Sequence, residues 1–249
     1  TYSNLQFVVT GSISTLIDRD AEETLTGRLE KYSMYPMKFV EYVRYNDVLD
    51  NLDGRSMQLR SALKNSLKDG DKSEFVDKLA SEYGLMDRVG PEMRSLKDEY
   101  MIKGGYPDVL GRDYASAYSI LDSNLRSTVR GDIPATFNVE KEQRLFTVLN
   151  MCAESSGQKI NVQNMADSAD ISRDTVERYL GYLSEFYLIN TSSKYYNSEY
   201  ESGGRDKIYI QDVGHLNTLQ GTLSEEALRS PERTGKILET VCSDLLRRL

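Results

Sequence analysis

The sequence predicts a protein that is mainly α with some β structure. Three segments with helical apolar periodicity lie close together between residues 141 and 187, and two strand-like runs, Tyr187–Thr191 and Lys207–Gln211, follow them. The strand-like runs flank a polar, glycine-bearing stretch, residues 197–206, which is typical of a hairpin. This order of elements predicts a winged helix-turn-helix over residues 135–215.

Each of the three helices is predicted by apolar residues at spacings of three and four. The first covers residues 143–153, and the short second covers residues 162–169. The inward face expected for the first comprises Leu145, Phe146, Val148, Leu149 and Cys152. Ser172 can cap the third by accepting a backbone N–H bond. The third helix directs polar residues outward near its N-terminal end, as a recognition helix does. Its inward residues are Val176, Tyr179, Leu180, Leu183, Phe186 and Tyr187, and its outward residues are Arg173, Asp174, Glu177 and Arg178.

Residues 1–43 have the pattern of half an α/β unit. A buried strand is expected over residues 5–10, a helix over about residues 14–25 and, after an alternating run over residues 29–35, a second helix that follows Pro36. A complete domain seldom begins on a central strand.

Residues 44–134 are charged and helical in pattern, which predicts a helical subdomain. Loops are expected at residues 50–54 and 68–72. The Gly-Gly-Tyr-Pro sequence at residues 104–107 is interpreted as a structural turn, with a phosphate cradle as the alternative. A further helix is expected from Tyr114 to Arg130, and residues 131–134 are expected to end it as a linker.

Residues 216–249 are interpreted as a linker and an amphipathic helix that begins near Lys236. The apolar face expected for that helix comprises Ile237, Leu238, Val241, Cys242 and Leu245. The expected domains are therefore residues 1–43, 44–134, 135–215 and 216–249.

The composition limits the classes of function. The chain has 249 residues and 39% hydrophobic content, which is enough for ordinary cores. Its 31 basic and 39 acidic residues argue against nonspecific binding of polyanions, although a local basic patch is compatible with them. A single His and two distant Cys make a zinc site or a disulfide framework improbable. Without a membrane-length apolar run or a leader, no membrane partner and a cytoplasmic location are expected.

Four short motifs follow one another along the chain. The first is Thr-Gly-Ser at residues 10–12, which ends a strand-like run, and the second is Gly27-Arg28 followed by Pro-x-x-Phe-x-Glu at residues 36–41. The third is Gly-Gly-Tyr-Pro at residues 104–107, and the fourth is Lys-Ile-Tyr-x-x-Asp-x-Gly at residues 207–214. In this order they resemble the archaeal and bacterial AAA-type ATPases that carry a DUF4143 region. The resemblance covers most of the chain and implies that residues 1–43 are the end of a P-loop NTPase core.

The chain departs from this family at the phosphate-binding motifs. A Walker A loop requires Gly-x-x-x-x-Gly-Lys-[Ser/Thr], and the nearest string, Thr234–Ile237, lacks the first glycine and the final hydroxyl. In the family both Walker motifs precede the sensor strand, so the resemblance implies that Thr1 follows a cut inside the ATPase core. ATP and Mg are expected in the intact protein only. This chain alone is expected to bind no cofactor and to lack ATPase activity.

The resemblance also implies a nuclease-like domain after the last helix of the chain. Glu239 matches a recurring acidic position of the family on that helix. One carboxylate cannot build a metal nuclease site, so we interpret Glu239 as structural.

Three catalytic residues are implied for the intact ATPase. Thr10 or Ser12, at the end of the expected sensor strand, would orient the attacking water. Arg28 looks like a cationic group that reaches a phosphate in its own or a neighbouring subunit. The alternative is that Gly27 is a helix C-cap and Arg28 an exposed residue after it.

Three functions remain open. The motif order favours a nucleotide-driven switch. A DNA-binding module would place the third helix in a major groove, with Arg173, Thr175 and Arg178 on bases or phosphates and Lys194 at the wing. Residues 141–200 contain six Lys or Arg and eight Asp or Glu, whereas DNA binders concentrate positive charge on the binding face. The third function is a protein-contact or lid domain. Double-stranded DNA and other protein subunits are therefore the candidate partners.

Overall fold

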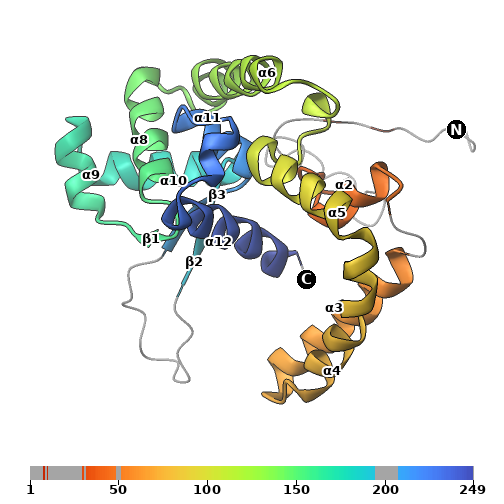
Figure 1. Cartoon of the computed structure of the whole chain (residues 1–249). Coiled ribbons are helices and arrows are strands. Elements are labelled where there is room, and N and C mark those ends of the chain that lie inside the picture. Colours follow the sequence, from red (N-terminus) through yellow and green to blue (C-terminus); the bar gives the residue numbers. More distant parts are fainter. Residues whose placement is uncertain are drawn as a thin grey trace, which may run out of the picture.

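The computed structural model describes residues 8, 10, 30, 32–48, 52–193 and 207–248. These residues form a mainly helical protein with one small three-stranded sheet, so the predicted fold class is confirmed. In Figure 1 the helical hairpin α3–α4 projects from one end, and α8, α9 and α10 lie at the other. Within the described part of the chain, no helix has the length and apolarity needed to cross a membrane.

The first half of the described chain is a run of helices. They are α2 (Phe39–Tyr45), α3 (Leu52–Asp69), α4 (Ser73–Ser81) and α5 (Tyr83–Lys103). The loop predicted at residues 68–72 separates α3 from α4, and its Gly70 has a positive φ of 74°. The loop predicted at residues 50–54 is wrong from Leu52 onward, because α3 begins there. One glycine inside a helix costs only about 1 kcal/mol, which tertiary contacts override.

The N-terminal expectations can be compared with the structure at a few residues only. Val8 and Thr10 are exposed and lie outside any strand. A strand needs a hydrogen-bonded neighbour, and neither residue pairs with another part of the described chain. Residues 32–35, the end of the alternating run, are also outside helices and strands. The helix expected over residues 14–25 and the wing expected over residues 197–206 lie outside the described residues.

The predicted linker at residues 131–134 is wrong. After the short 3₁₀ turn η1 (Pro107–Val109) and α6 (Tyr114–Ser127), the chain continues as a π-helical turn, η2 (Thr128–Asp132), and as α7 (Ile133–Phe137). Val129 and Ile133 are fully buried in the main core, so this stretch is held by packing. Pro134 is compatible with a helix here because it lies in the first turn of α7, where no intrahelical N–H bond is required.

Residues 142–210 contain the three helices and two strands that the sequence predicts, together with one short strand that it does not. The elements are α8 (Glu142–Glu154), β1 (Gln158–Lys159), α9 (Val162–Ala169), α10 (Arg173–Glu185), β2 (Ile189–Ser192) and β3 (Lys207–Ile210). The strands pair antiparallel in the order β1-β3-β2. The predicted N-cap is present, because the Ser172 hydroxyl accepts the Thr175 N–H at 3.2 Å.

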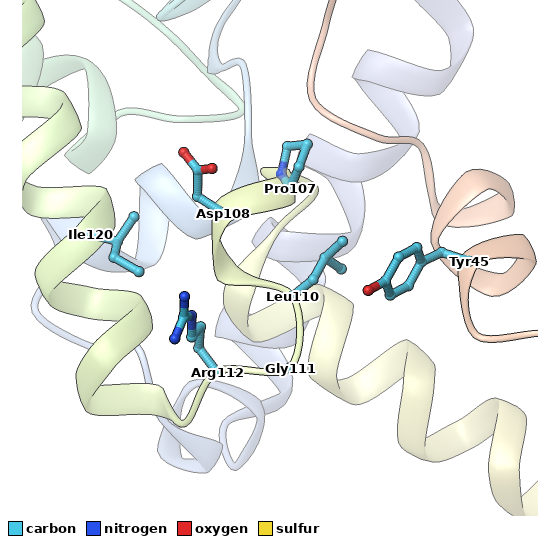
Figure 2. Close-up of a pocket in the computed structure, with 7 residues that line it drawn as sticks. All are labelled: Tyr45, Pro107, Asp108, Leu110, Gly111, Arg112 and Ile120. Atoms are coloured by element: carbon cyan, nitrogen blue, oxygen red, sulfur yellow. The ribbon is translucent and has the colours of Figure 1, made fainter.

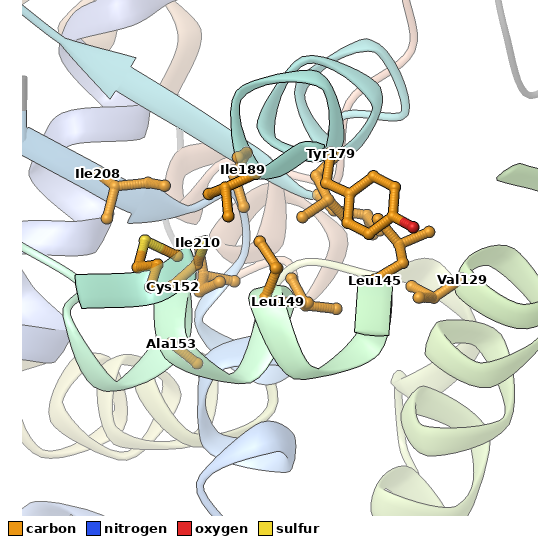
Figure 3. Close-up of a cluster of buried hydrophobic side chains, with 14 of the residues drawn as sticks. Val129, Leu145, Leu149, Cys152, Ala153, Tyr179, Ile189, Ile208 and Ile210 are labelled. Atoms are coloured by element: carbon orange, nitrogen blue, oxygen red, sulfur yellow. The ribbon is translucent and has the colours of Figure 1, made fainter. Parts of the chain in front are cut away.

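The main core lies between these helices and the sheet (Figure 3). Leu145, Leu149 and Cys152 from α8 meet Ile189 from β2 and Ile208 and Ile210 from β3 in this cluster. The residues predicted to point inward on α8 and α10 are buried or packed against the same cluster, apart from Tyr187. The helical periodicity therefore identified the correct faces.

The chain ends with α11 (Val213–Leu219), the 3₁₀ turn η3 (Glu225–Leu228) and α12 (Pro231–Arg247). The apolar face predicted for α12 is partly wrong. Ile237 is buried, but Leu238, Cys242 and Leu245 are exposed. Thr240 and Asp244 are buried instead. The reason is that the buried face of α12 makes hydrogen bonds, which an apolar periodicity does not detect.

Candidate functional site

The predicted catalytic residues are not brought together among the described residues. Thr10 is described, as an exposed residue without regular structure. Ser12 and Arg28, and also Lys194 at the predicted wing, lie outside the described residues. The roles of these four residues therefore stay predictions.

The predicted nucleic-acid-binding residues of α10 do lie together. We use the name α10 face for Ser172, Arg173, Thr175, Glu177 and Arg178. The hydroxyls of Ser172 and Thr175 are 2.8 Å apart, and Arg178 Nη2 donates to Thr175 Oγ1 at 3.3 Å. Arg173 Nε donates to Glu177 Oε1 at 3.0 Å. These contacts hold the side chains in one exposed cluster at the N-terminal end of α10.

The charge of this cluster is mixed. Arg173 and Glu177 form an ion pair with 64% and 51% of their side chains exposed. Arg144, on the neighbouring α8, pairs with Asp170 at 2.9 Å. The helix N-terminus adds partial positive charge, but nearby carboxylates neutralise two of the arginines. The α10 face can therefore form hydrogen bonds to an anionic or a polar partner, without a strong positive field.

A second group of polar residues is buried where α5 ends and α11 begins. Asp212 is 4% exposed and caps α11. Its Oδ1 accepts the N–H groups of Gly214 at 2.8 Å and His215 at 3.4 Å, while its Oδ2 accepts the Gly105 N–H at 2.8 Å. The Met37 N–H in turn donates to the Gly105 carbonyl at 2.7 Å. We call Met37, Gly104, Gly105, Asp212 and Gly214 the junction.

The glycines of the junction are required by close approaches. A Cβ on Gly105 would lie 2.0 Å from the Met37 carbonyl oxygen, and a Cβ on Gly214 would lie 2.0 Å from the Lys103 carbonyl oxygen. Gly104 also has a φ of +77°, and its Cβ would lie 2.1 Å from Asp212 Oδ1. The motifs at residues 36–41, 104–107 and 207–214, which are far apart in sequence, thus meet at one point.

Burial determines the electrostatics of the junction. It raises the pKa of the Asp212 carboxyl to about 6 against the lowering effect of the three N–H donors, and the charge of Asp244 adds to the rise. The His215 ring lies against the Tyr106 ring, with centroids 4.4 Å apart and the two planes tilted by 40°. Burial lowers the pKa of His215 to about 3, so the imidazole is neutral. Neither ring nitrogen has a hydrogen-bond partner in the described part of the chain.

The junction does not fit a phosphate ligand. The N–H groups of Gly104 and Gly105 are already donated, to the Tyr100 carbonyl at 2.8 Å and to Asp212. Thr234–Ile237, the string closest to a Walker A loop, lies inside α12, where a helix uses its own N–H groups. Among the described residues, no three His, Cys, Asp or Glu are grouped so as to hold a metal ion. The N–H groups of the junction and of residues 234–237 are therefore not available to a nucleotide phosphate.

Beside the Gly-Gly-Tyr-Pro turn lies an open pocket of about 590 Å³ (Figure 2). Its wall includes the apolar residues Pro107, Leu110 and Ile120 and one charged residue of each sign, Asp108 and Arg112. The pocket thus offers apolar contact and two opposite charges, but no paired nucleophile and base.

The connection of the Gly-Gly turn to Asp212 and Met37 was not predicted from the sequence, in which the turn was interpreted as structural. Two signals in the sequence indicate such a site: adjacent glycines at a helix end, and an Asp-x-Gly that follows a buried strand after one residue.

Together the fold and the junction define a mainly α protein in which the segment before α2 is bonded to a small antiparallel sheet unit. The chain belongs to the family described as "Domain of unknown function (DUF8612)", whose model matches residues 94–226, more than half of the chain. A model described as an AAA domain matches residues 1–43 and supports a relationship to AAA-type proteins. The DUF4143 resemblance stays a prediction.

A protein from Haemophilus influenzae, described as "Uncharacterized protein", is 24% identical to this chain over 197 residues. The match covers 77% of this chain and 40% of the relative. The chain thus spans about 40% of the length of the relative that it matches. No solved structure matches the chain.

Proposed function

We propose that this chain is the C-terminal portion of an AAA-type ATP-binding protein and that residues 135–215 form a winged helix driven by its nucleotide state. The order α8–β1–α9–α10–β2–β3, with antiparallel strands β1-β3-β2, supports the winged helix. The AAA match at residues 1–43 supports the ATPase part.

One observation carries the proposal: the hydrogen-bonded path from Met37 through Gly105 to Asp212. Met37 lies within the AAA match, and Asp212 follows β3 after one residue. Tyr100 strengthens the attachment, because its hydroxyl donates to the Met37 carbonyl at 2.9 Å. A displacement of the AAA segment would therefore break the Met37–Gly105 hydrogen bond or be passed on to Asp212 and the sheet, which supports the proposed coupling.

The junction does not supply the nucleotide site, because the N–H groups of Gly104 and Gly105 are already donated. We propose that Thr10, Ser12 and Arg28 approach the terminal phosphate in the intact protein. Substitution Arg28→Ala in that protein should lower the rate of ATP hydrolysis steeply and leave ATP affinity nearly intact. An unchanged rate would assign Arg28 to the role of an exposed residue after a helix.

The switch is tested by hydrogen exchange in the intact protein with and without Mg and ATP. Exchange in peptides covering residues 36–43, 104–110 and 207–215 is expected to change together on nucleotide addition. In the Asp212→Asn variant, nucleotide should still alter residues 36–43, but residues 207–215 should no longer follow. Nucleotide binding without any change at residues 207–215 of the wild type would refute the switch.

A second candidate function is DNA contact through the α10 face. The observation that favours it is the clustering of Arg173, Thr175 and Arg178 at an exposed helix N-terminus. Binding should be weak and should fall strongly with salt. The test is a fluorescence titration of double-stranded DNA at low salt with the wild type and with Arg173→Ala and Arg178→Ala. Absent binding, or equal binding by all three proteins, would favour a protein partner.

A further inference from the structure

The C-terminal turn of α12 carries a buried polar network that the proposed function does not use. Asp244 is 7% exposed and accepts hydrogen bonds from Gln211 Nε2, just after β3, and from Arg248 Nη2. Asp244 and Arg248 each expose only 10% of the side chain. This buried carboxylate therefore joins the sheet to the end of α12.

On the sheet side, amide groups complete the network. Gln211 Oε1 accepts from Asn190 Nδ2 at 3.3 Å, and Ser243 Oγ donates to Asn190 Oδ1 at 3.4 Å. Asn190 and Gln211 are each 3% exposed. Since buried polar groups are costly without partners, these bonds hold α12 in one register on β2 and β3.

On the other side, the network reaches the segment before α2. Arg248 Nη1 donates to the Pro36 carbonyl at 2.8 Å, and Lys38 Nζ donates to the Arg248 carbonyl at 3.2 Å. The guanidinium groups of Arg247 and Arg248 lie 5.0 and 5.3 Å from the centre of the Tyr35 ring. The negative end of the α12 dipole explains why cationic side chains gather here.

We infer that the C-terminal turn of α12 is a latch, in which Asp244 and Arg248 are positioning residues that hold residues 35–38 on the end of α12. Removal of the Asp244 charge leaves the buried Arg248 guanidinium without its ion-pair partner. The bond from Arg248 to Pro36 then loses its support, and the segment detaches more often. The latch consists of residues of this chain and does not depend on the proposed function. Only a control of the latch by nucleotide would rest on the proposed switch.

The methionines of the chain provide a direct test. With ¹⁵N-methionine labelling, the amide of Met37, which donates to Gly105, reports on the segment, while Met151 in α8 and Met165 in α9 report on the main core. Amide exchange is measured by NMR on this chain without nucleotide. Asp244→Asn should accelerate exchange at Met37 by about tenfold or more, because a hydrogen bond to a charged group is lost. Exchange at Met151 and Met165 should stay at the wild-type rate.

The matched control is Asp122→Asn. Asp122 and Arg126, on α6, also form an i,i+4 ion pair, but 26% of the Asp122 side chain and 48% of the Arg126 side chain are exposed. The Asp122→Asn substitution should leave exchange at all three methionine amides unchanged. Wild-type exchange at Met37 in a folded Asp244→Asn variant would overturn the latch, and so would equal acceleration at all three methionines.

If Asp244→Asn does not fold, Lys38→Gln tests the latch from the segment side. The protection factor of Met37, which corrects for the altered neighbour, should fall by about threefold or more as one charged hydrogen bond is lost. An unchanged protection factor would overturn the latch. Because no nucleotide is used, either result is independent of the proposed switch.

Discussion

The α10 face and the buried network around Asp212 and Asp244 use the same types of side chain in opposite surroundings. Arg173–Glu177 and Asp244–Arg248 are both i,i+4 ion pairs, yet the first exposes 64% and 51% of its side chains and the second 10% and 10%. Exposed pairs contribute little because water and salt screen them, whereas removing one partner of a buried pair is costly. Burial of the side chains, and not their spacing in the sequence, therefore determines how much stability is lost when one partner of the pair is removed.

The largest effect is expected for Gly214→Ala in the junction. Its Cβ would lie 2.0 Å from the Lys103 carbonyl oxygen, so the backbone must move and the Asp212 bonds are disturbed. The free energy of unfolding should fall by about 4 kcal/mol, as measured by urea denaturation. The control is Gly181→Ala in α10, where a Cβ meets no described atom within 4 Å and stability should rise by about 1 kcal/mol. Equal effects of the two substitutions would contradict the comparison.

His215→Leu should reveal an acid-dependent cost. The pKa of His215 is lowered from 6.5 to about 3, so the unfolded chain binds the proton more tightly than the folded one. The stability contributed by neutral His215 is therefore present above pH 6.5 and is lost as the pH falls. The free energy of unfolding of the wild type minus that of the variant should rise by about 3 kcal/mol from pH 4 to pH 7. A difference that is independent of pH would show that His215 is not buried as described.

Asp212→Asn should reveal a pH dependence of the opposite sign. The pKa of Asp212 is raised from 3.8 to about 6, so here the folded protein binds the proton more tightly. The contribution of Asp212 to stability should fall by up to about 3 kcal/mol as the pH rises from 4 through 6, and stay constant above. The measurement is the same difference between wild type and variant by urea denaturation. A difference that rises with pH would contradict the assigned burial of the carboxyl.

The smallest effect is expected on the α10 face. Arg173→Ala removes an exposed ion pair and should change the free energy of unfolding by less than about 0.5 kcal/mol. Because the fold is retained, any loss of DNA affinity in this variant can be assigned to contact. A destabilisation of several kcal/mol would show that the α10 face is structural and remove it from the candidate interfaces.

Local patterns in the sequence are enough to predict the elements of residues 142–210 that have clear periodicity. They identified the buried sides of α8 and α10 and the cap at Ser172, because a helix face and an N-cap depend on residues a few positions apart. They missed β1, which at two residues is too short to show a period. They also ended at Arg130 the helical run that begins at Tyr114, whereas η2 and α7 continue it to Phe137, because the packing of Val129 and Ile133 outweighs the local turn signals.

The junction and the latch, in contrast, could not be predicted from local patterns. Gly105 is hydrogen-bonded to both Met37 and Asp212, although the three residues are far apart in the chain. On α12 the buried residue is Asp244, whereas Leu245 is exposed. An apolar pattern predicts that such a residue is exposed, because burying a charge is costly unless it has partners. The partners of Asp244 are Gln211 and Arg248, and Gln211 comes close to it only when α12 is packed on the sheet.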